Sequence, residues 1–375
     1  MRKYDIFTCE SVTAGHPDKL CDAISDAVLD ACLKEDELSR VACETMASAG
    51  QVMISGQITT NANIDIPEIA RDTILKIGYD SDKKFFNGNT CAINLSINRQ
   101  SPDIALGVDI NGAGDQGMMF GYANNETDVC LPFALVKAHE LCQNLETAKE
   151  NTDFIYPDGK SQVTVEYDKN NKIKRIDTVL VSTQHSENID INDLRNNVVE
   201  DIIIPTFFDS TLLDEKTKIL VNPTGRFNIG GPLGDTGLTG RKIIVDTYGG
   251  YAPHGGGAFS GKDPTKVDRS AAYMARYLAK NILSKYNLTE CTVQLAYAIG
   301  VEQPISLTIL TNETELSEND KKDIKSYIKK NVDLSPKGII NRFDLRKPIY
   351  LPNVNHGHFG KNPDIYLWEK VDLFL

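Results

Sequence analysis

The residues best suited to chemistry lie between positions 255 and 268, where the sequence reads GGGAFSGKDPTKVD. Glycine lets a backbone approach a ligand closely and leaves N–H groups free to face anionic oxygens, and Lys262 and Lys266 add positive charge. Asp263 and Asp268 are expected to hold a metal ion on the same anion. The chain carries a net charge of −12, yet residues 241–270 contain five basic and three acidic residues. Positive charge concentrated in an acidic protein predicts an anionic ligand here.

The string Gly256-x4-Gly261-Lys262 is close to a phosphate-binding loop, but Asp263 stands where that motif has Ser or Thr. The apolar run IIVD at 243–246 is expected to be a strand, and it does not lead directly into the loop. A P-loop NTPase or kinase is therefore the weaker interpretation. A solvated glycine loop is the other alternative, and it leaves the local charge unexplained.

A second cluster is GHPDK at residues 15–19, where Pro17 occupies the position that favours the first turn of a helix. His16 and Asp18 would then lie at a helix N-terminus, where the helix dipole favours an anion. They would place an imidazole and a metal-binding carboxylate beside a phosphate. The alternative is that these residues, with Lys19, only cap the helix.

Other polar residues lie in glycine-rich turns. Asp115 in GAGDQG and Asp235 in GGPLGD are carboxylates in fixed turns, which suits ligand contacts and ordinary turn chemistry equally. His356 and His358 in NHGHFG resemble a metal-binding pair. No cysteine or carboxylate pattern of matching spacing accompanies them, so turn or interface histidines are the favoured interpretation.

The elements that must position these residues follow a recurring order of helix, two strands, helix and strand, which occurs three times without a sequence repeat. We predict three similar units in an α/β (α+β) fold, each a mixed sheet with helices on one face, packed around a common centre. The predicted strands are 4–7, 41–47, 52–60, 91–97, 162–167, 176–183, 219–222, 243–246, 292–298 and 305–310. The predicted helices begin at Pro17 and after Pro67, or cover 131–145, 191–204, 267–286 and 317–330.

Two connections, 98–117 and 222–240, are glycine-rich and longer than most loops, which is typical of lids and binding segments. Arg226, Arg241 and Lys242 lie on or beside the second of them. Three cations around a glycine loop suit a polyphosphate better than a solvated surface.

The composition, with 375 residues, 41% hydrophobic and 25% charged, predicts a globular protein of two or three domains. The acidic net charge and the lack of a basic run argue against nucleic-acid and membrane-surface binding, so the expected partner is a small molecule. The eight cysteines form no C-x-x-C pair, and neither an apolar leader nor an apolar span of 18 residues occurs. A cytoplasmic location with reduced thiols is therefore expected.

Six stretches of the sequence match, in order, the motifs of one known family. They are GHPDK (15–19), GAGDQG (112–117), PDGKSQV (157–163), STQHS (182–186), NPTGRFNIGGPLGDTGLTGRKIIVDTYGG (222–250) and GGGAFSGKDPTKVDRSAAY (255–273). From about residue 4 to residue 369, the chain resembles the S-adenosylmethionine synthetases, or methionine adenosyltransferases. The resemblance implies three pseudo-threefold domains at 1–100, 110–230 and 231–370. It also implies a homodimer with active sites at the interface, often paired into a dimer of dimers.

The reaction implied by the resemblance is attack of methionine sulfur on C5′ of ATP, with the expelled triphosphate hydrolysed to diphosphate and phosphate. A neutral sulfur needs no base, so catalysis must come from alignment and from stabilising a leaving group of about four negative charges. The implied cofactors are magnesium, two ions per site, and potassium.

The resemblance also implies residue roles. His16 would contact the phosphate chain near the breaking bond, and Lys160, Arg241, Lys242, Lys262 and Lys266 would hold the phosphates. Asp18 and Asp268 would bind magnesium, and Glu44 potassium. Asp158, Arg226, Phe227, Asp235 and Ala258 would also contact ATP. Methionine would meet Gln57, Gln100, Asp115, Asp235 and Lys266, and the segment 100–113 would be a mobile loop over the site.

Three features depart from the family pattern. Where the family has GEIT, this chain has Gln57 in place of the glutamate that would face the methionine amino group. Ala14 replaces the common glutamate before GHPDK, and the covering loop is a few residues short. These departures leave open a second hypothesis, an impaired relative that binds nucleotide as a regulatory subunit. The intact basic and acidic residues of the motifs favour the active enzyme.

Overall fold

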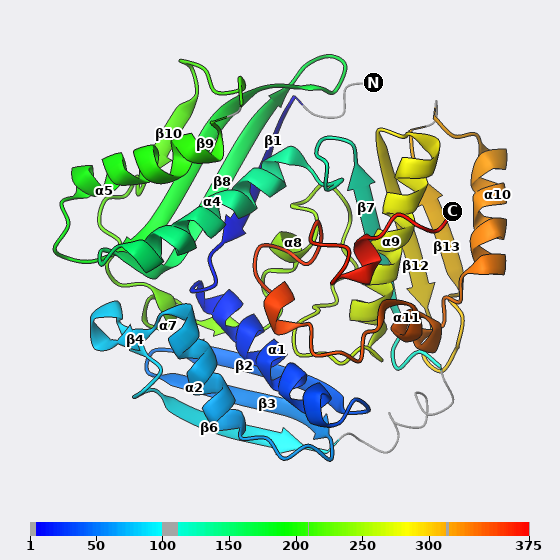
Figure 1. The fold of residues 1–375 in the computed structure, drawn as a ribbon, viewed down its shortest axis with the longest axis horizontal. Helices are drawn as coiled ribbons and strands as arrows, with labels where there is room; N and C mark the ends of the chain where they lie inside the picture. Colours follow the sequence, from blue (N-terminus) through cyan, green and yellow to red (C-terminus); the bar gives the residue numbers. More distant parts are fainter. Residues whose placement is uncertain (1–4, 100–111, 209, 313–314, 375) are drawn as a thin grey trace.

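The computed structural model describes residues 5–99, 112–208, 210–312 and 315–374. Within these residues, the chain forms three larger sheets and one small hairpin. The sheets are mixed or antiparallel, and each carries helices on one face (Figure 1). The fold class predicted from the sequence is therefore confirmed. Gln100 and nearly all of the expected loop 100–113 lie outside the described residues.

The first sheet has the order β11-β2-β3-β6, and the helices α1 and α2 cover one face of it (Figure 1). β2 and β3 run antiparallel, and β3 and β6 run parallel. Asp65 accepts a hydrogen bond from the amide of Glu68 and so caps α2. The bounds are α1 Pro17–Glu35, β2 Arg40–Ser48, β3 Gln51–Thr59, α2 Ile66–Ile77, β6 Ala92–Asn98 and β11 Gly237–Leu238. The hairpin consists of β4 Asp80–Ser81 and β5 Phe86–Asn87.

The second sheet has the order β1-β8-β9-β10, with α4 packed on it and α5 beside it (Figure 1). The bounds are β1 Ile6–Val12, α4 Phe133–Asn151, β8 Ile155–Tyr167, β9 Ile173–His185, α5 Ile191–Val198 and β10 Lys218–Val221. One π-helical turn, Val199–Ile203, and the short α6, Ile204–Thr206, continue the direction of α5.

The third sheet has the order β13-β12-β7, with α9 and α10 on one side. The bounds are β7 Gly117–Asn124, α9 Val267–Tyr286, β12 Glu290–Tyr297, β13 Ser306–Leu310 and α10 Glu318–Asn331. A short helix, α11 (Pro336–Phe343), then leads into a C-terminal segment that runs across the middle of the molecule (Figure 1). Neither β7 nor α11 was predicted from the sequence.

Each sheet takes a strand from a distant part of the chain. β1 pairs with β8, β7 pairs with β12, and β11 pairs with β2. The three sheets are therefore tied together by chain crossings, although the predicted order of elements suggested three units each built from consecutive residues.

Helices α1 and α9 occupy the centre of the molecule, and both are buried along most of their length. Buried ion pairs join them to each other and to the loops. Arg269 on α9 holds both carboxylate oxygens of Asp26 on α1, at 2.8 and 2.7 Å. Lys19 pairs with Asp246 and lies 3.1 Å from Asp22. Because a buried charge is costly without its partner, these pairs fix the start of α1 relative to the segment around Asp246.

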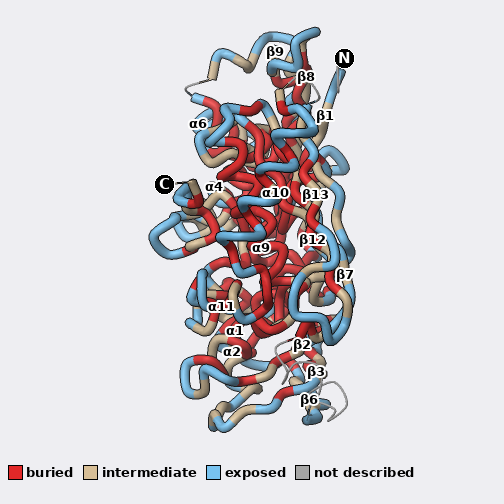
Figure 2. The backbone as a smooth tube through the Cα atoms, turned by 90° about the vertical axis from the view of Figure 1, so that its right-hand side faces the viewer, coloured by how far each residue is buried: buried red, intermediate tan, exposed pale blue. Residues whose placement is uncertain are grey.

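Two predictions about the fold are wrong. Residues Ile243–Asp246 form one helical turn, α8, and not a strand. A single turn buries Val245 and Asp246 together and brings Asp246 to Lys19, whereas alternate residues of a strand would face opposite sides. The sheets also do not bury one another around a centre. Figure 2 shows them side by side along one flank of the molecule, with exposed and half-buried residues on that flank and the helices behind.

Candidate active site

The start of α1 presents a histidine and an aspartate. Pro17 begins the helix, and Nδ1 of His16 accepts a hydrogen bond from the amide of Asp18 at 3.2 Å. Burial lowers the pKa of His16 to about 3, with further lowering from Lys242 and Lys160. The ring is therefore neutral near pH 7, and its Nε2 carries the proton as a donor. The capping interpretation and the functional one are compatible, because the cap uses only one ring nitrogen.

Asp18 is the meeting point of three segments. Its Oδ2 lies 2.5 Å from Nζ of Lys242, and its Oδ1 accepts from the amide of Leu238 at 3.0 Å. Arg241 lies 3.7 Å from the same Oδ1. Burial raises the pKa of Asp18, but the hydrogen bonds from Lys242 and Leu238 outweigh it, and the pKa falls below its ordinary value. Asp18 is thus ionised, and it holds Lys242 and Arg241 near the N-terminus of α1.

The middle of β8 brings a further cation to the same place. β1 and β8 run antiparallel with Val12 opposite Lys160, and Thr13 donates to the carbonyl of Gly159 at 3.0 Å. Lys160 is exposed, on the face of the sheet that no helix covers. Its charge contributes to the lowered pKa of His16, which places it near the imidazole.

Asp158 precedes this lysine and is almost fully buried. Its Oδ2 accepts a hydrogen bond from the amide of Gly231 at 2.9 Å. Burial raises the pKa of Asp158 to about 6, against the opposing effects of the Gly231 amide and of Lys160. This contact fixes the glycine-rich loop 222–240 against β8. Asp235, which also raises the pKa of Asp158, is exposed on that loop.

The glycine-rich stretch 255–262 lies against β2 and against the loop that carries Arg241. The amide of Cys43 donates to the carbonyl of Gly261 at 2.9 Å. A Cβ on Gly261 would lie 1.9 Å from the carbonyl oxygen of Cys43, and the φ of Gly261 is +78°, so only glycine fits. A Cβ on Gly240 would lie 2.5 Å from that of Ala258. The glycines therefore permit close backbone contact between segments, in addition to any ligand contact.

Lys262 joins a second acidic group. Its Nζ lies 2.7 Å from Oδ2 of Asp268, the second residue of α9. Burial raises the pKa of Glu44 on β2, and the nearby charge of Lys262 partly offsets this. Glu44, Lys262 and Asp268 thus form a group of their own, beside the glycine stretch.

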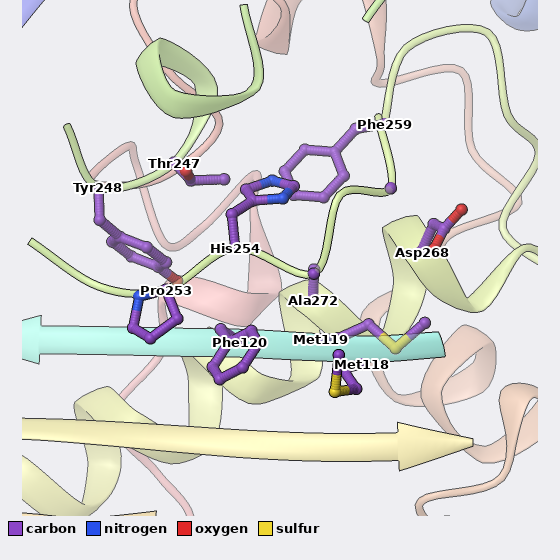
Figure 3. A pocket seen from close by; sticks show the side chains of 12 residues that line it. Met118, Met119, Phe120, Thr247, Tyr248, Pro253, His254, Phe259, Asp268 and Ala272 are labelled. Atoms are coloured by element: carbon purple, nitrogen blue, oxygen red, sulfur yellow. The ribbon is translucent and has the colours of Figure 1, made fainter. Parts of the chain in front are cut away.

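A small hollow opens next to Asp268, between β7 and the glycine stretch. In Figure 3, Met118, Met119 and Phe120 line one side of it, and His254 and Phe259 line the other. Nδ1 of His254 accepts from the amide of Gly256 at 2.8 Å, which orders the glycine stretch. Burial lowers the pKa of His254, against the opposing charge of Asp268. This histidine was not predicted from the sequence.

The expectation that Asp263 holds a metal is wrong. Its side chain is fully buried and accepts hydrogen bonds from the amide of Val41 at 2.8 Å, from Thr265 Oγ1 at 2.6 Å and from Lys266 Nζ at 2.5 Å. It therefore anchors the turn to β2 and leaves no oxygen free. The P-loop interpretation also fails, because the residue in the magnesium-binding position of that motif is used for this purpose.

The remaining predicted site residues lie outside the two groups formed around Asp18 and Asp268. Gln57 is exposed on β3, opposite Ala42 and next to Asn98, and Asp115 is exposed with its carboxylate on the amide of Gln116 at 2.7 Å. Arg226 is exposed, while the amide of Phe227 donates to Nε2 of His185 at 3.0 Å. Lys266 pairs with Asp263, with its Nζ 2.5 Å from Oδ2.

The two C-terminal histidines do not form a metal site. His358 is buried and lies 2.9 Å from the hydroxyl of Tyr273, and His356 lies 3.2 Å from Glu146. In the part of the chain that the structure describes, no group of three histidine, cysteine or acidic side chains could hold a metal ion. The prediction that these are structural histidines agrees with this geometry. No helix in the same residues is long and apolar enough to cross a membrane.

Comparison with known proteins covers nearly the whole chain. Three family models match, described as the N-terminal, central and C-terminal domains of S-adenosylmethionine synthetase, over residues 4–102, 110–227 and 229–370. The chain belongs to the S-adenosylmethionine synthetase family. It is therefore a transferase, as the sequence motifs indicated. Proteins named S-adenosylmethionine synthase from two strains of Staphylococcus epidermidis are each 50% identical to it, across 98% of this chain and 96% of the relative.

In this chain, residues from three of the motifs quoted above meet at the N-terminus of α1, and Lys262 and Asp268 from a fourth form the second group beside Glu44. Three buried acidic residues that bind the segments around these groups were not predicted. They are Asp22, whose carboxylate accepts from the amide of Gly240 at 2.8 Å, Asp246, which pairs with Lys19, and Asp26, which accepts from the amide of Gly261 at 2.8 Å.

Proposed function

We propose that this protein forms S-adenosylmethionine from ATP and L-methionine, by attack of the methionine sulfur on C5′ of ATP. The triphosphate is then hydrolysed to diphosphate and phosphate. The observation that carries the proposal is the convergence of His16, Lys160, Arg241 and Lys242 around the N-terminus of α1. Such a group of cations matches the charge that develops on a polyphosphate leaving group.

The neutral His16 suits a contact with the phosphate chain. Since Nδ1 is occupied by the amide of Asp18, the N–H at Nε2 is the donor that remains for an oxygen near the breaking bond. Because the pKa of His16 is lowered to about 3, the ring stays neutral near pH 7 and keeps this N–H donor. Lys242 and Arg241 would turn from Asp18 to the phosphates when ATP binds. Lys262 would do the same from Asp268.

The acidic residues fit magnesium as this ion is usually bound, through one or two carboxylates with substrate phosphates and water completing the octahedron. Asp18 and Asp268 each offer one carboxylate, now paired with a lysine at 2.5 and 2.7 Å. The side chain of Asp268 is 27% exposed and that of Asp18 is 3% exposed, so Asp268 is the more accessible ligand. Two magnesium ions held there would neutralise the triphosphate. Glu44 would hold potassium beside Lys262.

Methionine would bind near Gln57, Asp115 and Gln100, and the nucleotide near Arg226, Phe227, Asp235 and Ala258. Asp158 would contact ATP only by a change of partner, because its carboxylate is buried on the amide of Gly231. Lys266 likewise would have to leave Asp263 to reach a substrate. The segment 100–113 would cover the site.

We also propose a homodimer with active sites at its interface, which could pair further into a tetramer. Glu44 on β2, Gln57 on β3 and Lys160 on β8 all lie on sheet faces that no helix covers. An exposed apolar residue, Met118, lies on the open face of the third sheet and is 52% exposed. Large apolar residues on an open face are typical of a surface that is covered by another molecule.

The test is to incubate the purified protein with ATP, methionine, magnesium and potassium, and to identify the products by mass spectrometry. We expect S-adenosylmethionine together with equal amounts of phosphate and diphosphate. Release of phosphate without a sulfonium product would overturn the proposal. If ATP stayed intact while protecting the protein from thermal unfolding, the impaired nucleotide-binding relative would be the better account.

A further inference from the structure

A carboxylate on α4 reaches the turn that carries His16. Oε1 of Glu146 accepts a hydrogen bond from the backbone amide of Ala14 at 2.6 Å and lies 3.2 Å from Nε2 of His356. The three residues come from separate parts of the sequence, so this one side chain joins α4, the turn before α1 and the C-terminal segment. The side chain of Glu146 is 21% exposed and that of His356 is 19% exposed.

The turn at residues 13–16 has little freedom to move. The amide of His16 donates to the carbonyl of Thr13 at 3.0 Å, and the hydroxyl of Tyr79 donates to the carbonyl of Gly15 at 2.6 Å. A Cβ on Gly15 would lie 2.3 Å from the carbonyl oxygen of Pro157. Ala14 itself is 7% exposed. Its amide therefore needs a partner inside the protein, because an unpaired buried amide is destabilising.

The charge of Glu146 is also stabilised. Burial raises its pKa, but the hydrogen bond and charge of His356, the amide of Ala14 and the charge of Lys149 outweigh this, and the pKa falls below its usual value. The carboxylate is thus ionised near pH 7, and the amide that it binds belongs to Ala14, two positions before His16. Position 14 carries no acidic side chain in this chain, whereas the family motif has glutamate there.

We propose that Glu146 is a positioning residue, which holds the amide of Ala14 and thereby fixes the imidazole of His16. In doing so it supplies, from α4, the negative charge that a glutamate at position 14 would bring. Ala14 is small enough to leave room for it. The catalytic readout of this inference rests on the proposed function, whereas the contact between Glu146 and Ala14 does not.

The experiment is a double-mutant cycle on the full-length protein with Glu146→Ala, Ala14→Glu and the combination of both. Because small misplacements of a catalytic group are costly, Glu146→Ala should lower kcat by about 10- to 100-fold and change the KM for methionine by less than about twofold. Ala14→Glu alone should also lower kcat, because it would bring a second carboxylate close to that of Glu146, and the two like charges would repel each other. The combined variant should recover kcat to within about threefold of the unmodified protein.

Glu146→Gln is the second variant, since it keeps an acceptor for the Ala14 amide without the charge. We expect it to retain more activity than Glu146→Ala and to show a thermal unfolding midpoint close to that of the unmodified protein. The inference is overturned if the combined variant is no more active than Glu146→Ala, or if Ala14→Glu alone has no effect.

Failure of the proposed function is distinguishable from failure of this inference. If the unmodified protein forms no S-adenosylmethionine, the proposed function falls, and the same cycle is then measured as ATP affinity by calorimetry. If the combined variant recovered ATP affinity, this would still support the inference that the carboxylate of Glu146 takes the place of one at position 14. Additive losses would overturn it.

Discussion

Nζ of Lys242 lies 2.5 Å from Oδ2 of Asp18, so a cation that would hold a phosphate is kept in place by a carboxylate that would bind a metal. An arriving metal–polyphosphate complex can satisfy both groups at once, because the phosphate takes the lysine and the metal takes the carboxylate. The site is thus preorganised before the substrate arrives, and neither charge is left unpaired.

Asp18→Asn tests this exchange. The amide cannot balance Lys242 or bind magnesium with a charge, so we expect kcat to fall by about 100-fold or more. The magnesium concentration for half-maximal activity should rise in the same variant. Asp364→Asn, which alters an exposed carboxylate in the C-terminal segment, is the control and should change neither quantity. Equal activity of both variants would remove Asp18 from the site.

Asp263 and Asp268 are five residues apart, and their substitutions should have opposite signatures. Asp268→Asn should abolish most activity with a small change in thermal stability, because that side chain is 27% exposed and pairs only with Lys262 among the contacts described above. Asp263→Asn should instead destabilise the fold by about 3–5 kcal/mol, because it leaves buried partners without their charge. Thermal unfolding and steady-state kinetics separate the two. A loss of stability in Asp268→Asn alone would contradict the assignment.

Gln57→Glu should strengthen methionine binding. A charged acceptor gains about 1 kcal/mol over a neutral one, which corresponds to a KM for methionine lower by about fivefold. The preference for methionine over its analogues should sharpen as well. Gln51→Glu is a matched control, since Gln51 is exposed on the same strand and the same face. If KM and analogue preference both stayed unchanged, Gln57 would have no part in binding methionine.

The buried histidines should make the protein sensitive to acid. Burial lowers the pKa of His139 and of His358 well below 6.5. Above pH 6.5 neither the folded nor the unfolded state binds a proton at these rings. Below it the unfolded state does, so the free energy of unfolding falls by up to about 1.4 kcal/mol per pH unit for each ring.

This pH dependence is checked by denaturant unfolding at pH 7, 6 and 5 with the protein concentration held constant. His139→Gln should be less stable at pH 7, where it weakens the contact with Ser11 Oγ, which lies 2.8 Å from Nδ1. Its stability should then fall less steeply with acid than that of the unmodified protein. An identical slope would mean that His139 is not kept neutral by the fold.

Met118→Lys should separate the proposed dimer. Met118 is 52% exposed on β7, at the edge of the open sheet flank, and a lysine there would bury charge on association. Light scattering should show a shift toward the monomer mass, and activity should fall with it. Phe208→Lys is the control, because Phe208 is 82% exposed and closely follows α6, a helix that lies on the side opposite the strands (Figure 2). Dissociation in the control as well would point to a different interface.

The sequence predicted those elements whose conformation depends on residues nearby in the chain. Pro17 predicted the start of α1 correctly, and the apolar periodicity of 267–286 predicted α9 to the residue. The segment 243–246 was misassigned because an apolar run of four residues fits a strand and a buried helical turn equally. Its conformation is decided by the distant partner Lys19.

The basic residues of the candidate site could be predicted from the sequence. The acidic residues that hold the surrounding backbone in place could not. Lys242, Lys262 and His16 stand out by type and by their glycine neighbours. Glu146 does not, because its partner is a backbone amide 132 residues away and an amide has no sequence signature. The burial of Asp263 could not be predicted from the sequence either. Asp263 and Asp268 both lie close to glycines, and only the hydrogen bonds that Asp263 accepts from Val41 and Lys266 show that it is structural.

The exchange of strands between sheets has a consequence for synthesis of the chain. β1 is the first strand to be made, yet its partner β8 begins at Ile155, and β7 has to wait for β12, which begins at Glu290. Edges of sheets thus stay without neighbours until late in translation, and an open edge is a place where other chains can pair. We infer that shortened forms of this protein aggregate, and that a ribosome-bound chain gains protection only when its last third has emerged.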